Sequence, residues 1–191
     1  SVTGLPAGVA RELLEQGLLK MEDNHLRFAH ALLQDGTAAT VLRDHRVAVH
    51  AAAARWFEQR DPVLHAHHLQ HAGSPAAPAA WMGAARLQRS IGRMEDARQS
   101  LEYAVSGASG QAQAEAQVEL GNVLHHLAQV AAALNAFKAA QAQTQKPAVR
   151  AEAVLGEVAC LESMERPQEA LALLDSAADA ILAVPRQDLH A

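Results

Sequence analysis

A repeat of small residues at intervals of 36 and 37 positions is the feature that most constrains how this 191-residue chain can fold. Ala97, Ala133 and Ala170 set the interval, and each is followed four residues later by a large apolar side chain. Small side chains at such a period let paired helices pack closely, and each pair then buries its apolar face against the next pair. The pattern predicts three stacked helical hairpins in residues 79–191.

The composition agrees with a stack of helices. Half of the residues are hydrophobic, but only 3% are aromatic, and alanine supplies much of the apolar fraction. Alanine has the highest helix propensity, and its small side chain allows close contact between helices. We therefore predict an all-α fold in one large or two small domains.

A second position, twelve residues before each repeated alanine, is small in two of the three repeats. Ala85 and Gly121 are small enough for paired helices to touch, whereas the third repeat has Val158 at this position. The third repeat also carries Pro167 at the expected turn between its helices.

The first seventy residues have a different pattern. Two short segments flank Asp23-Asn24, a pair that favours turns, and they predict a β-hairpin that is the only sheet of the chain. In order, we expect a helix from about Leu5 that ends at Gly17, the hairpin over residues 18–29, a helix through Leu32 and Leu33, a long helix over 40–59 and a short histidine-rich helix over 63–72.

Residues 78–183 resemble the tetratricopeptide repeat family, which has small residues at fixed positions of a unit of ~34 residues. The second repeat carries the best match, through Gly121, Ala133, Phe137 and Ala140. The resemblance implies a tetratricopeptide-like α-solenoid of helix hairpins.

The N-terminal segments Phe28-x-His30-x-Leu32-Leu33 and Ala66-His67-His68-Leu69-x-x-Ala72-Gly73 suggest a second resemblance. They are similar to the stretch that joins the winged helix of a STAND-type signalling ATPase to its helical repeats, as in LuxR/MalT-like transcriptional regulators. This resemblance implies a winged-helix remnant in residues 1–38, connecting helices in 39–73, a linker in 74–78 and three repeats in 79–191. It also implies that an ATPase domain lies upstream in a longer parent chain.

We find no catalytic motif in the sequence. No Gly-x-x-x-x-Gly-Lys segment occurs, so the chain lacks a phosphate-binding loop of that kind. Cys160 is the only cysteine, and nearby glutamates such as Glu157 raise a thiol pKa rather than activate the thiol. We predict that the chain is not an enzyme and holds no cofactor.

Four histidines in one short helix raise the question of a metal. His67 and His71 lie one turn apart, as do His65 and His68, and this spacing suits zinc. A zinc site needs a further ligand from elsewhere, and the sequence indicates none. We predict packing roles and no metal.

The charge pattern bears on the class of partner. The net charge is −5, and the acidic excess lies in residues 111–191. The first helix carries Arg11 together with the acidic residues Glu12 and Glu15, so it lacks the basic surface that binds the phosphates of nucleic acid. We favour a protein or peptide partner without direct nucleic-acid contact, and direct DNA binding through the winged helix is the alternative. The absence of a long apolar run and the single cysteine predict a cytoplasmic protein without membrane contact.

In tetratricopeptide-like stacks the first helix of each pair lines a concave face that binds peptides. By this resemblance the groove comprises Met82, Arg86, Arg89, Val118, Asn122, His125, His126, Leu155 and Glu162. Arg86 and Arg89 lie one turn apart and could hold a carboxylate of the partner. The expected function is a regulatory interaction module of a larger STAND-type ATPase or transcriptional regulator.

Overall fold

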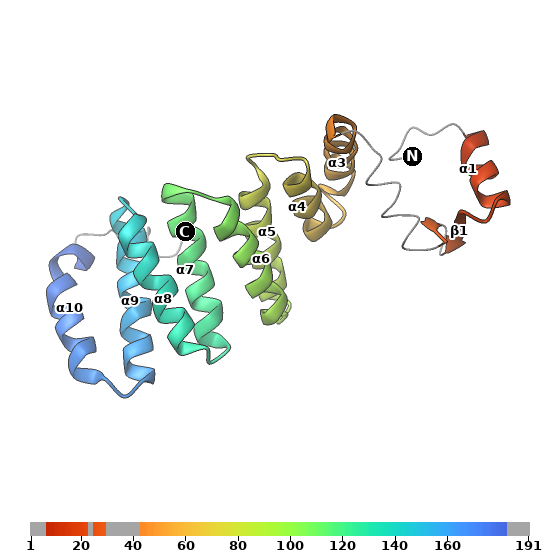
Figure 1. Ribbon diagram of the computed structural model, residues 1–191. Coiled ribbons are helices and arrows are strands. Elements are labelled where there is room, and N and C mark those ends of the chain that lie inside the picture. Colours follow the sequence, from red (N-terminus) through yellow and green to blue (C-terminus); the bar gives the residue numbers. More distant parts are fainter. Residues whose placement is uncertain (1–6, 23–24, 30–42, 183–191) are drawn as a thin grey trace. The chain divides into compact units, whose positions relative to one another are not determined.

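The structure, a computed structural model, describes residues 7–22, 25–29 and 43–182. These residues are mostly helical and contain one small antiparallel sheet (Figure 1). The prediction of an all-helical chain with a single hairpin is confirmed for this part. The chain divides into two compact units, Ser1–Ser74 and Pro75–Ala191.

The first unit begins with helix α1 (Ala7–Glu15) and the hairpin of β1 (Leu19–Glu22) and β2 (His25–Phe28). Helix α1 ends because Gly17 adopts a positive φ of 69°, a conformation that glycine reaches without steric cost. The strands pair antiparallel, with Leu19 opposite Phe28. The predicted hairpin therefore forms, whereas the helix predicted through Leu32 and Leu33 lies outside the described residues.

Helices α3 (Arg43–Phe57) and α4 (Pro62–His71) complete the described part of the first unit and pack against each other. Helix α4 begins after Asp61 because that residue caps its N-terminus: Asp61 Oδ1 accepts hydrogen bonds from the backbone N–H groups of Val63 and Leu64. Pro62 occupies the first turn, where proline favours the start of a helix. The long helix and the short histidine-rich helix thus lie where the sequence places them, within a few residues.

The second unit consists, in its described residues, of six helices. They are α5 (Ala77–Ser90), α6 (Met94–Gly107), α7 (Gly110–His126), α8 (Val130–Gln143), α9 (Pro147–Ser163) and α10 (Pro167–Leu182). Each helix packs against the next one, and α7 also contacts α9. The connections are short, so consecutive helices run antiparallel (Figure 1).

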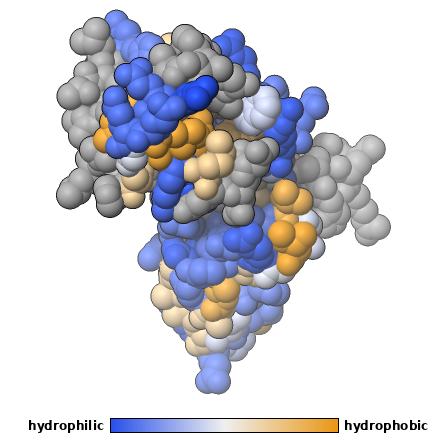
Figure 2. Space-filling view, turned by 90° about the vertical axis from the view of Figure 1, so that its right-hand side faces the viewer, coloured by the Kyte–Doolittle hydropathy of each residue, from blue (hydrophilic) through white to orange (hydrophobic). Residues whose placement is uncertain are grey.

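The repeated alanines lie in the second helix of each pair and are buried. Ala97 in α6, Ala133 in α8 and Ala170 in α10 are at most 3% exposed. Figure 2 shows one end of the molecule, where hydrophobic residues form separate patches among hydrophilic ones. Each of the repeated alanines belongs to a core cluster that also contains residues of a neighbouring helix.

The ring of Phe137 occupies the centre of the second unit. Phe137 in α8 is 1% exposed, and its ring lies against Gly121 in α7 and Gly156 in α9. A Cβ atom added at Gly121 would come within 2.6 Å of the ring, and one added at Gly156 within 2.4 Å. The alignment of the repeats assigns Val158 to the small position of α9, but the residue that must be small for Phe137 is Gly156.

We predict that Gly156→Ala destabilises the chain. Glycine to alanine inside a helix normally stabilises a protein by up to ~1 kcal/mol. Here the new methyl group meets a buried ring, and overpacking of this kind costs roughly 1–3 kcal/mol. Urea denaturation monitored by circular dichroism measures the difference.

Gly83→Ala is the matched control, because Gly83 lies in α5 and a Cβ atom there has no atom within 4 Å. It should leave stability unchanged or slightly higher. Equal stability of the two variants would contradict the packing of Phe137 against Gly156.

Candidate functional site

A hollow of about 760 Å³ crosses the first helices of the three pairs in the second unit. Helices α5, α7 and α9 and the connection before α9 supply its walls. The lining residues are Met82, Arg86, Arg89, Glu115, Val118, Glu119, Asn122, Lys146, Ala148, Val149, Glu152, Leu155, Gly156 and Ala159. We refer to this surface as the groove.

The groove contains most of the residues that the sequence suggested. Met82, Arg86, Arg89, Val118, Asn122 and Leu155 line it. His125, His126 and Glu162 do not, because they lie in the last turns of α7 and α9, beyond the hollow. His125 instead joins the two helices, with Nε2 3.0 Å from Ser163 Oγ.

Sequence reasoning missed the acidic side of the groove. Glu119 follows Glu115 on α7 by four residues, and Asn122 follows Glu119 by three, so all three share one helix face. Glu152 and Leu155 are related in the same way on α9. Extending the predicted face by one helical turn toward the N-terminus of α7 and α9 would have found Glu115 and Glu152, whereas Glu119 lies within the predicted stretch, next to Val118.

Arg86 and Arg89 are already bound to a carboxylate within the chain. Arg86 Nη2 lies 2.7 Å from Glu119 Oε1, and Arg89 Nη1 lies 3.0 Å from Glu119 Oε2. The Glu119 side chain is only 17% exposed, so the contact connects α5 and α7 at the wall of the groove. The sequence suggested that this arginine pair holds a carboxylate of the partner, but the carboxylate that it holds belongs to α7.

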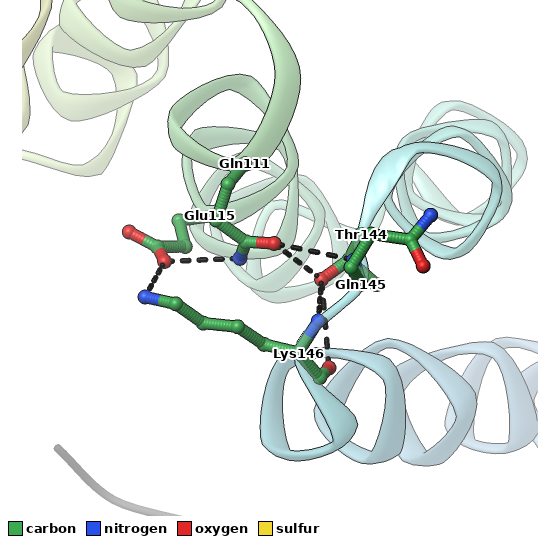
Figure 3. A network of polar contacts seen from close by, with 5 residues as sticks. All are labelled: Gln111, Glu115, Thr144, Gln145 and Lys146. Carbon is green, nitrogen blue, oxygen red and sulfur yellow. Dashed lines mark hydrogen bonds and ion pairs between the residues drawn. The ribbon is translucent and has the colours of Figure 1, made fainter.

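A second polar network connects α7 to the α8–α9 connection (Figure 3). Lys146 Nζ donates to Glu115 Oε1 at 2.8 Å, and Gln111 Nε2 donates to the same oxygen at 3.0 Å. The hydroxyl of Thr144, which is fully buried, donates to Gln111 Oε1 at 2.9 Å. The hydrogen bond from Lys146 is the main cause that lowers the pKa of Glu115. The network fixes the start of α9 at the edge of the groove.

Apolar side chains separate the two charged networks. Val118 is buried in the wall, Met82 is half-buried, and Leu155 is 42% exposed. Asn122 adds an exposed amide from α7. The groove can therefore offer apolar contact and hydrogen bonding, while three of its basic groups are paired with its own glutamates.

The histidines of α4 pack against α3. His65 Nδ1 lies 2.8 Å from the carbonyl oxygen of Ala54, and the ring of His68 stacks on Phe57 with centroids 5.5 Å apart. Within the described ranges, no group of three His, Cys, Asp or Glu side chains is placed to hold a metal ion.

Two further findings concern reactivity and membranes. Cys160 is buried, and burial and the charge of Glu157 both raise its pKa, so the thiol is unsuited to nucleophilic chemistry. Among helices in the described part of the chain, none combines the length and the apolar character needed to cross a membrane.

No protein-family model matches the sequence, and no curated protein matches it significantly. The assignment of a function therefore depends on the groove and on the residue patterns of the chain.

We predict that Lys146→Met raises the pKa of Glu115 toward its usual value, because the substitution removes the main cause that lowers it. A carboxyl group with a lowered pKa adds stability above its unfolded pKa and loses that contribution as the pH falls through its folded pKa. The wild-type chain should therefore lose this contribution in acid, below about pH 4.5, and the variant should lack it. Carboxyl-carbon NMR titration of Glu115 measures the shift.

Lys138→Met is the control, because Lys138 pairs with Glu157 rather than Glu115. The Glu115 titration should be unchanged in this variant. An unchanged titration in Lys146→Met would refute the role given to Lys146.

Proposed function

We propose that the second unit is a tetratricopeptide-like interaction scaffold that binds a peptide or protein segment in the groove. One observation carries the proposal: side chains from the first helix of three successive pairs line one continuous hollow. Stacked helical repeats use such concave surfaces to bind extended partners. The volume of the hollow also lies within the range of ~300–1,000 Å³ that is common for ligand sites.

The charges in the groove indicate what chemistry the partner needs. Each of the three basic groups is already paired within the chain: Arg86 and Arg89 share Glu119, and Lys146 pairs with Glu115. A strongly charged partner would have to displace these pairs, whereas an apolar side chain could bind between them, beside Met82 and Leu155. We therefore propose a peptide with large apolar side chains, which supply most of the binding free energy, and with backbone groups that hydrogen-bond to Asn122.

Direct DNA binding, the alternative function, has no comparable support. On α1, which would be the recognition helix, Arg11 pairs with Glu15 at 3.0 Å. A helix that enters DNA needs basic groups free to contact phosphates.

The wider role rests on the sequence resemblance of the first seventy residues. We propose that the chain is a non-catalytic, cytoplasmic part of a STAND-type ATPase or LuxR/MalT-like regulator. Binding of an effector in the groove would then be relayed to the ATPase domain of the parent chain. Fold-level analogy supplies this part of the proposal.

Binding in the groove can be tested with peptides selected from a displayed random library on the wild-type chain. We predict that the double variant Asn122→Ala, Leu155→Ala weakens binding of the selected peptides by about tenfold or more, which corresponds to ~1.4 kcal/mol. Fluorescence anisotropy with labelled peptides measures the dissociation constants.

The double variant Asn135→Ala, Leu171→Ala is the matched control. It makes the same two chemical changes at exposed helical positions on α8 and α10 that do not line the groove. Its affinity should equal that of the wild type. Equal affinities of both double variants, once circular dichroism shows both to be folded, would place the binding site elsewhere.

A further inference from the structure

Four histidines form a continuous cluster of rings between α3 and α4. His50 comes from α3, and His67, His68 and His71 come from α4. The ring centroids of His50 lie 5.1 Å from His68 and 5.0 Å from His71, and those of His67 and His71 are 4.3 Å apart. We call these four residues the histidine cluster.

The contact between His50 and His68 limits how many protons the histidine cluster can hold. Their Nδ1 atoms are 2.9 Å apart, which is a hydrogen-bond distance. One Nδ1 must donate and the other must accept, but a protonated imidazole carries a hydrogen on both nitrogens. The contact therefore requires at least one of the two rings to be neutral.

The surroundings also disfavour positive charge on these rings. Among the described residues, the charged groups that act on them are the neighbouring imidazoles and Arg46 on α3, and none is a carboxylate. Arg43 and Arg46, both on α3, line a hollow together with His50, and Gln70 and His71 line it from α4. Each added proton therefore meets other groups of the same sign.

Burial is the first cause that lowers the pKa of His50, His67 and His68, and repulsion from neighbouring charges is the second. A histidine with a lowered pKa adds stability that is fully present above its unfolded pKa, about 6.5. That contribution is lost as the pH falls through the folded pKa. Acidification below about pH 6.5 should thus weaken the contact between α3 and α4.

We propose that the histidine cluster is a proton-sensitive contact that holds α4 against α3 near neutral pH and releases it in acid. The fully buried residues that the structure describes in α3 and α4 are three alanines, Ala53, Ala54 and Ala66, and the half-buried ring of Phe57 stacks on His68 of the histidine cluster. The rings of the histidine cluster therefore contribute directly to the contact between the two helices. This proposal does not depend on peptide binding in the groove.

Hydrogen exchange followed by mass spectrometry tests the proposal on the full chain, in buffer with a chelator, from about pH 7.5 to about pH 5. After correction for intrinsic exchange rates, α3 and α4 should lose their protection severalfold or more in acid, because the pKa values of three histidines in this contact are all lowered. Helices α7 and α8 should keep theirs and act as the internal reference. Equal responses of both helix pairs would overturn the proposal.

The variant His50→Gln, His68→Gln keeps polar side chains that cannot be protonated, and it should remove most of the acid-dependent loss in α3 and α4. His126→Gln, which changes an exposed histidine of α7, is the control and should behave like the wild type. A loss in the double variant as large as in the wild type would also overturn the proposal.

If the double variant does not fold, NMR titration of the wild-type histidines decides the question. The proposal requires His50 and His68 to gain protons below about pH 6.5 and in separate steps, because their rings share one hydrogen bond. Titration of both rings at or above that pH would refute it.

Discussion

The second unit depends on the contact of one aromatic ring with two glycines. Phe137 extends from α8 and lies against Gly121 of α7 and Gly156 of α9. Because neither glycine has a side chain, the ring reaches both backbones, and three helices share one buried centre. Close packing of this kind is strongly sensitive to volume, since protein interiors leave few voids.

The groove depends on the same contact. Gly156 lines the groove and also lies against Phe137, so the wall of the groove at this point is only one backbone thick. The ring brings α7 and α9 close enough for Lys146 to reach Glu115 and for His125 to reach Ser163. These polar contacts then keep the groove-facing sides of both helices in register. The core thus sets the spacing of the groove, and the polar contacts set its shape.

The sequence predicts the local features of this fold better than the long-range ones. The hairpin agrees with the turn preference of the pair Asp23-Asn24, and the start of α4 follows from Asp61 and Pro62, because neighbours in the sequence decide these features. Phe137 and Gly156 are far apart in the chain, and a repeat alignment that counts from alanines assigns Val158 to the small position instead.

The groove shows the same division. Helical spacing correctly places Arg86 and Arg89 on one face, since periodicity fixes which residues share a face. It does not reveal that Glu119, thirty residues further along the chain, supplies their carboxylate. Which carboxylate meets which arginine depends on how the helices place α5 beside α7, and a single sequence does not show such pairing directly.

The two units differ in the chemistry that joins their helices, and this difference determines where the chain should open first. The largest fully buried side chains among the described residues, including Phe137, Leu101 and Val123, all belong to the second unit. The contact between α3 and α4 instead combines small alanines and the half-buried ring of Phe57 with imidazole rings, which change charge near neutral pH. Local opening free energies follow buried apolar contact. The α3–α4 pair is therefore the part of the described chain in which a modest change of protonation can shift a conformational equilibrium, while the packing around Phe137 keeps the groove intact.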